Sequence, residues 1–287
     1  MFDPKKLLPI TVLMLILSLG IVYTSWTSGT VPMGVDLKGG TVIIIPTSQS
    51  VEGLDTLIKN QFGIEARSRA IKDFSGNIKQ QEIVISKKDL TEAEQTEIKN
   101  LIDSQYLALS IAHGEVLSES VSGFFSDLFF RESIKAIAFA FLFMAVVIFA
   151  KFRTFVPSFA VVFSAFADIV ETFAAMIVFG IELSKGSIIA LLLLIGYSVD
   201  TDIMLTSRLL KQGGRRQLDE TIKHSLFTGL TMAGTTMVAM VVLYLVSTSS
   251  LLDTIALVII IGILFDIMNT WITNLAVLKS YVEGGGK

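Results

Sequence analysis

The sequence predicts an α-helical polytopic membrane protein with six transmembrane helices and one extracytoplasmic α+β domain. Hydrophobic residues make up 52% of the chain and charged residues 17%, and the mean hydropathy is +0.68. These values exclude an ordinary soluble domain. Six apolar stretches are long enough to cross a bilayer, which takes about 20 residues of helix, and a charged segment rich in turn-forming residues separates the first stretch from the second.

We expect the membrane spans near 7–25, 133–151, 156–178, 187–207, 223–246 and 251–278. The first apolar run is long for a signal peptide and "TSWTSG" is a poor cleavage site, so we interpret it as an uncleaved anchor. The expected domains are a cytoplasmic tail with the first span (1–29), an outer α+β domain (30–130), and a five-helix bundle with a cytoplasmic tail (131–287).

Basic residues are concentrated in alternate loops. They are Lys5, Lys6, Lys151, Arg153, Arg208, Lys211, Arg215, Arg216, Lys223, Lys279 and Lys287. The opposite short loops, "GIELSKGS" and "STSS", carry only Lys185. The positive-inside rule therefore predicts a protein of the cell membrane with both termini in the cytoplasm and residues 30–130 outside.

The outer segment alternates strand-like and helix-like patterns in the order β-α-β-β-α-β. "GGTVIIIP" is typical of a strand, and "IEARSRAIKDF" and "IKQQEIVISK" of a hairpin joined at "SGN". In the helical "LTEAEQTEIKNLIDSQY", Thr91 and Glu94 have the spacing of a capping box. This order predicts a ferredoxin-like layer of helices on an antiparallel sheet.

Several classes of function find no support in the sequence. No nucleophile–base constellation and no metal-ligand spacing is present, so we expect neither an enzyme nor a metal or cofactor. The absence of cysteine excludes thiolate chemistry. A net charge of −3 and the lack of a basic stripe with aromatic residues argue against a nucleic-acid partner.

Acidic residues inside the predicted spans are the main functional signal. The fourth span contains Asp200 and Asp202, the third Asp168 and Glu171, and the sixth Asp266. An ionised Asp at the bilayer centre costs about 2.5–3.5 kcal/mol on insertion scales. Such residues are usually functional, and a carboxyl that gains and loses a proton is the basic element of a proton path.

Helical spacing separates these acids by face. Asp168 and Glu171, three residues apart, share a face. Asp200 and Asp202 are two apart and point about 200° away from each other. Asp200 shares its face with Tyr197.

Polar residues accompany the acids in the neighbouring spans. The sixth span adds Asn269, Thr270 and Asn274, and the fifth carries Thr231, Gly234 and Thr235 along one stripe. Hydrogen bonds between membrane helices average only about 0.6 kcal/mol. Ser and Thr would be sufficient to form such hydrogen bonds. We therefore favour a functional role for the intramembrane acids over simple helix–helix adhesion.

At the outer end of the first span, "GVDLKGGT" contains Asp36, Gly39 and Gly40. The glycine pair permits close backbone approach or positive φ. On its own this predicts a tight turn into the first strand.

The motif order resembles that of the SecF family of protein-export membrane proteins, in the wider resistance-nodulation-division (RND) superfamily. "GVDLKGGT", "GYSVDTDIMLTSRL" and "SLFTGLTMAGTT" resemble the family signatures at the first strand, the fourth span and the fifth span. The residues at these motif positions are most similar to those of archaeal SecF chains that are separate from SecD. The resemblance implies that the chain is one half of an RND-like fold.

The resemblance also implies a function. The expected partners are the subunit SecD, a SecYE-type translocon, the translocating polypeptide and the lipid bilayer, and the expected energy source is the proton gradient. It implies Asp200 as the main proton carrier with Asp168 and Asp266 as partners, and Arg208 as a structural partner. Asp36 with the two glycines would couple the anchor to the outer domain.

The chain departs from the usual SecF pattern at two positions. Asp200 and Thr201 stand where many bacterial chains have Asn-Asp, and Ser207 replaces an acidic residue before the arginine. These departures leave open which acid carries the ion, and whether the ion is H⁺ or Na⁺.

Three other functions remain as alternatives. An RND-type exporter of small molecules or lipids would need a second outer domain or dimerisation. An intramembrane aspartyl hydrolase would need two acids facing each other. A passive assembly subunit of the translocon would carry no proton flux.

Overall fold

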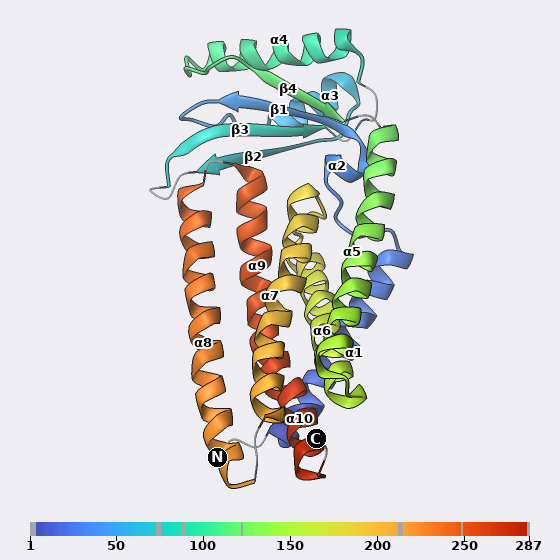
Figure 1. Cartoon of the computed structure of the whole chain (residues 1–287). Coiled ribbons are helices and arrows are strands. Elements are labelled where there is room, and N and C mark those ends of the chain that lie inside the picture. The colour runs from blue at the N-terminus through green and yellow to red at the C-terminus, as the bar shows by residue number, and fades with distance from the viewer. Residues whose placement is uncertain are drawn as a thin grey trace.

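The chain consists of a bundle of long helices with a small sheet domain at one end (Figure 1). The computed structural model describes residues 4–72, 76–85, 87, 90–121, 123–211, 215–247 and 249–285. The bundle contains α1 (Pro4–Thr27), α5 (Gly123–Phe152), α6 (Phe155–Phe179), α7 (Lys185–Leu210), α8 (Arg215–Val246), α9 (Ser250–Met268), the π-helix η1 (Asn269–Asn274) and α10 (Leu275–Glu283).

The described residues form six helical stretches that are long and apolar enough to cross a membrane. Each expected span lies inside one of them, and the last runs without a break through α9, η1 and α10. The predicted six-span fold class is confirmed. The helix α5 begins at Gly123, within the range expected for the outer domain, and continues directly into the span.

The sheet domain has the predicted order of elements. It contains β1 (Gly40–Pro46), α3 (Leu54–Phe62), β2 (Ala66–Lys72), β3 (Ile78–Ile85), α4 (Glu92–Ala108) and β4 (Leu117–Val121), preceded by the short helix α2 (Val35–Lys38). The strands are antiparallel in the order β2-β3-β1-β4, which is the ferredoxin-like arrangement. In the expected hairpin turn, Gly76 and Asn77 are described and Ser75 lies outside the described residues.

One face of the sheet is covered by α3 and α4, and the other faces the helical bundle (Figure 1). Alternation along β1 produces this division, since neighbouring residues of a strand point to opposite faces. Ile43 and Ile45 are fully buried in the core under the two helices. Val42 and Ile44 instead line a cleft between the sheet and the bundle.

The turn into β1 depends on its glycine pair both for positive φ angles and for close approach of the backbone to a neighbouring strand. Gly39 and Gly40 have φ angles of 77° and 151°, in the range that favours glycine. A Cβ atom on Gly40 would overlap the carbonyl oxygen of Ile85 in the adjacent strand. The local backbone geometry therefore requires glycine at both positions.

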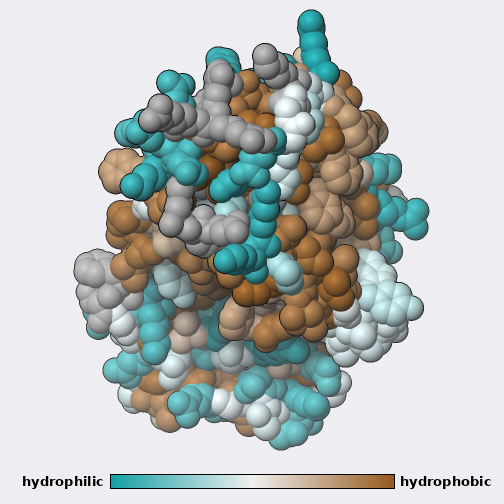
Figure 2. Space-filling view, turned by 90° about the horizontal axis from the view of Figure 1, so that it is seen from below, coloured by the Kyte–Doolittle hydropathy of each residue, from teal (hydrophilic) through white to brown (hydrophobic). Residues whose placement is uncertain are grey.

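The helices α6, α7 and α9 form the inside of the bundle. In the most apolar part of α6 and α7, 50% and 56% of residues are buried, against 11% for α5 and α8. Apolar residues such as Phe143 and Val238 are therefore exposed along the outer helices, as in a bilayer. Seen from the end away from the sheet, hydrophilic side chains are interspersed with hydrophobic ones (Figure 2).

Candidate functional site

Four of the five intramembrane acids lie together inside the bundle. Asp168 and Glu171 come from α6, Asp202 from α7 and Asp266 from α9, and each is at most 1% exposed. Because the three helices pack against one another, residues far apart in sequence meet at the middle of the bundle. We call these four residues the acid cluster.

An amide and a hydroxyl hold the α6 side of the acid cluster. The Asn269 Nδ2 atom donates to Asp168 Oδ1 and to Glu171 Oε2, both at 2.8 Å. The Ser198 hydroxyl donates to Asp168 Oδ2 at 2.5 Å. Every one of these donors is itself buried, so the carboxyl groups have exchanged water for protein donors.

The α7 side of the cluster is held by two residues of the last span. Asn274 Nδ2 lies 2.6 Å from Asp202 Oδ1, and Thr270 Oγ1 lies 2.9 Å from the same oxygen. Thr270 Oγ1 also lies 3.2 Å from Asp266 Oδ1. Two acids from different helices therefore share one hydroxyl.

The π-helix η1 supplies the polar side chains that hold the acids. Its hydrogen bonds run between residues five apart, so Asn269 and Asn274 lie closer to a common face than residues five apart do in an α-helix. Such π-helical turns are frequently found at functional sites. The local widening lets one short segment contact acids on both α6 and α7.

No cation neutralises the acid cluster among the described residues. None of the ion pairs there includes any of the four acids. Four buried carboxyl groups without a neutralising cation cannot all be ionised in a low-dielectric interior. The arrangement can therefore hold and exchange protons.

Binding of a metal ion has less geometric support than proton exchange. Within the described residues, no group of three or more His, Asp or Glu side chains is arranged to hold a metal ion.

The structure does not bring the other predicted residues into this network. Asp200 is exposed on the opposite side of α7 from Asp202, as their spacing predicts. Tyr197 is half-buried in an apolar cluster with α8 and α9. Thr235 donates to the Met232 carbonyl of its own helix, at 2.9 Å.

The arginine at the end of α7 is also outside the acid cluster. Arg208 Nη1 donates to Thr228 Oγ1 of α8 at 3.2 Å. This contact links the end of α7 to the interior of α8, so Arg208 has a structural contact and no acidic partner among the described ion pairs.

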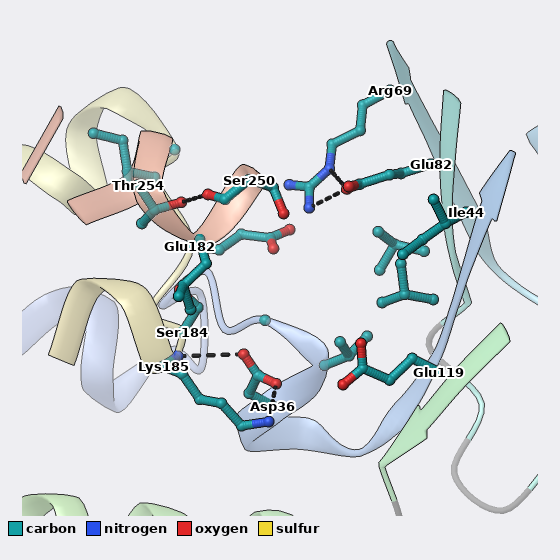
Figure 3. A pocket seen from close by; sticks show the side chains of 17 residues that line it. Asp36, Ile44, Arg69, Glu82, Glu119, Glu182, Ser184, Lys185, Ser250 and Thr254 are labelled. Atoms are coloured by element: carbon teal, nitrogen blue, oxygen red, sulfur yellow. Dashed lines mark hydrogen bonds and ion pairs between the residues drawn. The ribbon is translucent and has the colours of Figure 1, made fainter. Parts of the chain in front are cut away.

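A second candidate site lies where the sheet domain meets the bundle. Asp36 Oδ2 accepts from the backbone nitrogen of Lys185, the first residue of α7, at 3.3 Å, and Asp36 Oδ1 lies 3.0 Å from Lys185 Nζ (Figure 3). A carboxylate at a helix N-terminus is favourable because it meets free N–H groups and the positive end of the helix dipole. Two further backbone bonds hold the same segments together, from Leu183 to Pro32 and from Gly34 to Leu183.

A cleft of about 490 Å³ lies beside this junction. One wall is the bundle-facing side of the sheet, where Arg69 lies 2.7 Å from the buried carboxylate of Glu82. The other wall is formed by the α6–α7 connection and the start of α9, with Glu182 and Ser250 (Figure 3). Asp36 and Lys185 also line the cleft, so their contact lies at its edge.

The fold and the acid cluster together define a class: polytopic membrane proteins with an RND-like half and a polar centre. Structural comparison agrees. SecDF from Thermus thermophilus, described as a translocon-associated membrane protein, matches with a TM-score of 0.78 at 19% identity, over 98% of this chain and 38% of that chain. SecDF in its super-membrane-facing form matches with a TM-score of 0.56 at 17% identity, over 99% of this chain and 39% of that chain.

Sequence comparison makes the assignment specific. The family model described as protein export membrane protein SecD/SecF, C-terminal, matches residues 107–284. SecF of Methanolacinia petrolearia is 37% identical over 100% of this chain and 96% of its own length, and SecF of Pyrococcus furiosus is 37% identical over 98% and 92%. SecF of Thermococcus gammatolerans is 39% identical over 87% and 78%. The chain belongs to the SecF family of protein-export membrane proteins.

Proposed function

We propose that this chain promotes the export of polypeptides across the cell membrane, acting with a SecD-type subunit beside a SecYE-type translocon and using the proton gradient. Its relatives are named protein-export membrane proteins, and its structural neighbour is described as translocon-associated. The chain spans only 38% of that SecDF chain, so a separate partner subunit would supply the rest.

The observation that carries this proposal is the acid cluster. Structural adhesion between helices would not need four buried carboxyl groups, and a hydrolase would need water and substrate to reach two of them. Neutralisation and ionisation of these acids would change the electrostatic cost of packing α6, α7 and α9 together. An ion gradient could then drive a change in helix packing.

We propose Asp202 as the central coupling acid, with Asp168, Asp266 and Glu171 as its partners. Asp202 is fully buried and contacts the last span, whereas Asp200 is exposed. An exposed carboxyl inside a span is expensive in lipid. Asp200 therefore belongs on a surface covered by the partner subunit, and its effect on coupling should be smaller than that of Asp202.

The junction at Asp36 would transmit the change to the sheet domain. In this proposal the sheet domain lies outside the cell and contacts the emerging polypeptide. The Asp36 carboxylate joins the entry to that domain to the first turn of α7, and Gly39 and Gly40 make the tight turn that follows. Movement of α7 would reach the domain through this contact.

The test is the rate of completing polypeptide export in membrane vesicles that contain the partner subunit and translocon. The proton gradient is imposed and collapsed, and wild type is compared with Asp202→Asn and Asp200→Asn. We expect Asp202→Asn to keep basal export but lose the gradient-dependent part, because the amide cannot release a proton. Asp200→Asn should retain most of that part.

Each alternative predicts a different result. If all single variants of the acid cluster respond to the gradient like wild type, the result favours a passive assembly subunit of the translocon. If a sodium gradient alone drives the process in wild type, the coupling ion is Na⁺. Equal loss in both variants would place Asp200 in the ion path, as the family resemblance implies.

A further inference from the structure

Thr270 occupies an unusual position between two acids. Its hydroxyl oxygen lies 2.9 Å from Asp202 Oδ1 and 3.2 Å from Asp266 Oδ1, and all three side chains are at most 1% exposed. A threonine hydroxyl has a single hydrogen to donate. Both contacts can therefore be full two-centre hydrogen bonds only when one of the two carboxyl groups carries a proton and donates it to Thr270.

The neighbouring residue Asn269 makes a different kind of bridge. Its amide nitrogen has two hydrogens, so it can donate to Asp168 and Glu171 at the same time. That bridge is compatible with two ionised carboxylates and needs no proton to complete it. The hydroxyl bridge at Thr270 is the one that depends on protonation.

Thr270 also differs from the threonines of α8. In α8, Thr231 and Thr236 donate to carbonyl oxygens of their own helix, at 2.8 and 3.1 Å, which is the usual behaviour of threonine in a helix. The hydroxyl of Thr270 lies within hydrogen-bond distance of carboxyl groups instead. Its placement in the π-helix η1 faces it toward both acids.

We propose that Thr270 is a proton relay between Asp266 and Asp202, a role that rests on the proposed function of the acid cluster. The O–H bond on Asp266 Oδ1 breaks and its proton binds Thr270 Oγ1, while the original hydroxyl hydrogen of Thr270 moves to Asp202 Oδ1. Thr270 ends with one hydrogen, now donated to Asp266. One proton has moved to Asp202, one negative charge has moved to Asp266, and the step reverses along the same atoms.

Asn274 stabilises the ionised form of Asp202 and so favours release of the proton that the relay delivers. Its amide donates to Asp202 Oδ1 at 2.6 Å, so the ionised form of Asp202 has two donors on one oxygen. The other oxygen, Asp202 Oδ2, is buried and makes no hydrogen bond among the described residues. That oxygen can accept a further hydrogen-bond donor without displacing Thr270 or Asn274 from the other oxygen.

The first test uses the export assay with its partner subunit and translocon. Thr270→Val keeps the shape of the side chain and removes the hydroxyl, and Thr270→Ser restores it. We expect Thr270→Val to lower the gradient-dependent rate by about tenfold, the size expected for loss of a hydrogen bond to a charged group. Thr270→Ser should recover that rate.

The matched control is Thr273→Val. This threonine lies in the same π-helix, is 5% exposed, and donates to Thr11 of α1 at 2.8 Å. Its hydroxyl contacts no carboxyl group, and its only link to the acid cluster among the described residues is a long contact of 3.4 Å to Asn269 Oδ1. It should keep the gradient-dependent rate. If Thr270→Val equals wild type while Asp202→Asn loses coupling, the relay is overturned and the proposed function stands.

A second measurement decides the relay even if export does not depend on the acids. Infrared spectra of the chain in lipid vesicles report the C=O stretch of protonated carboxyl groups. We expect Asp202→Asn to shift the band of Asp266 when Thr270 is present, because the hydroxyl changes its partner, and not in the Thr270→Val background. An equal shift in both backgrounds, or none in either, would contradict the relay.

Discussion

Glu94 is a single side chain held in its ionised form at the start of a helix. Lys87 Nζ lies 2.5 Å from Glu94 Oε1, and Glu94 Oε2 accepts from the backbone nitrogen of Thr91 at 3.0 Å and from its hydroxyl at 2.9 Å. These donors, the hydrogen bond from Lys87 first among them, lower the pKa of Glu94 to about 2. The capping box that the sequence predicts at Thr91 is confirmed.

The lowered pKa makes the first turn of α4 dependent on pH. Because the pKa is lower in the folded chain, the stabilisation is complete above the ordinary value of 4.5 and is lost as pH falls toward about 2. We expect amide hydrogen exchange at 92–95, corrected for its intrinsic rate, to accelerate over that range. Glu94→Gln should exchange faster at neutral pH and show little of this dependence; an unchanged dependence would assign it to another carboxyl group.

Individual acids show where prediction from sequence reaches its limit. Spacing alone predicts that Asp168 and Glu171 share a face and that Asp200 and Asp202 do not, and both hold. Spacing does not say which face of α7 is inside, because that depends on where α6 and α9 pack. The proposed role of Thr270 is also beyond prediction from the sequence: its spacing from Asp266 is that of neighbours on a helix, but its contact with Asp202 depends on where α7 packs.

Helix packing near the acid cluster depends on a small residue in α8. A Cβ atom on Gly229 would overlap the Trp271 ring of η1, which is rigid and 5% exposed. Gly234, further along α8, has no heavy atom within 4 Å of its Cβ position. The two glycines therefore separate the effect of packing from that of helix propensity.

We expect opposite effects from alanine at these two glycines. Gly229→Ala forces α8 away from η1 and should lower the free energy of unfolding by about 1–3 kcal/mol, as overpacking does. Gly234→Ala should raise it by up to about 1 kcal/mol, since alanine favours a helix. Unfolding in mixed micelles, followed by the fluorescence of Trp271 in a Trp26→Phe background, measures both. Equal changes in the two variants would rule out the steric contact.

Elements were easier to predict than their exact geometry. The spans follow from the length of apolar runs, and the sheet domain follows from alternation and turn residues. The π-helix η1 was not predicted, because "NTWITN" continues an apolar helical pattern and carries no helix-breaking residue. Its only signal in the sequence was the group of amide and hydroxyl side chains beside Asp266.

On the scale of the whole molecule, charge asymmetry and architecture lead to one testable orientation. The sheet domain lies at one end of the bundle and α10 at the other (Figure 1). The basic loop residues predict that the α10 end faces the cytoplasm.

The natural absence of cysteine makes this orientation directly measurable. Thr56→Cys lies at an exposed position of α3, and Ser280→Cys at an exposed position of α10. In intact cells, a membrane-impermeant maleimide should label Thr56→Cys and should label Ser280→Cys only after permeabilisation. The reverse pattern would place the sheet domain in the cytoplasm and exclude contact with emerging polypeptides.

The anchoring of α7 by Asp36 has a mechanical consequence. Lys185, whose backbone Asp36 caps, and Asp202 lie seventeen residues apart in one unbroken helix (202 − 185), about 25 Å at 1.5 Å per residue. A continuous α-helix transmits axial displacement with little compression, since every turn is braced by hydrogen bonds to the next. A shift of α7 along its axis by a fraction of a turn at the acid cluster would therefore reach the base of the sheet domain nearly undiminished.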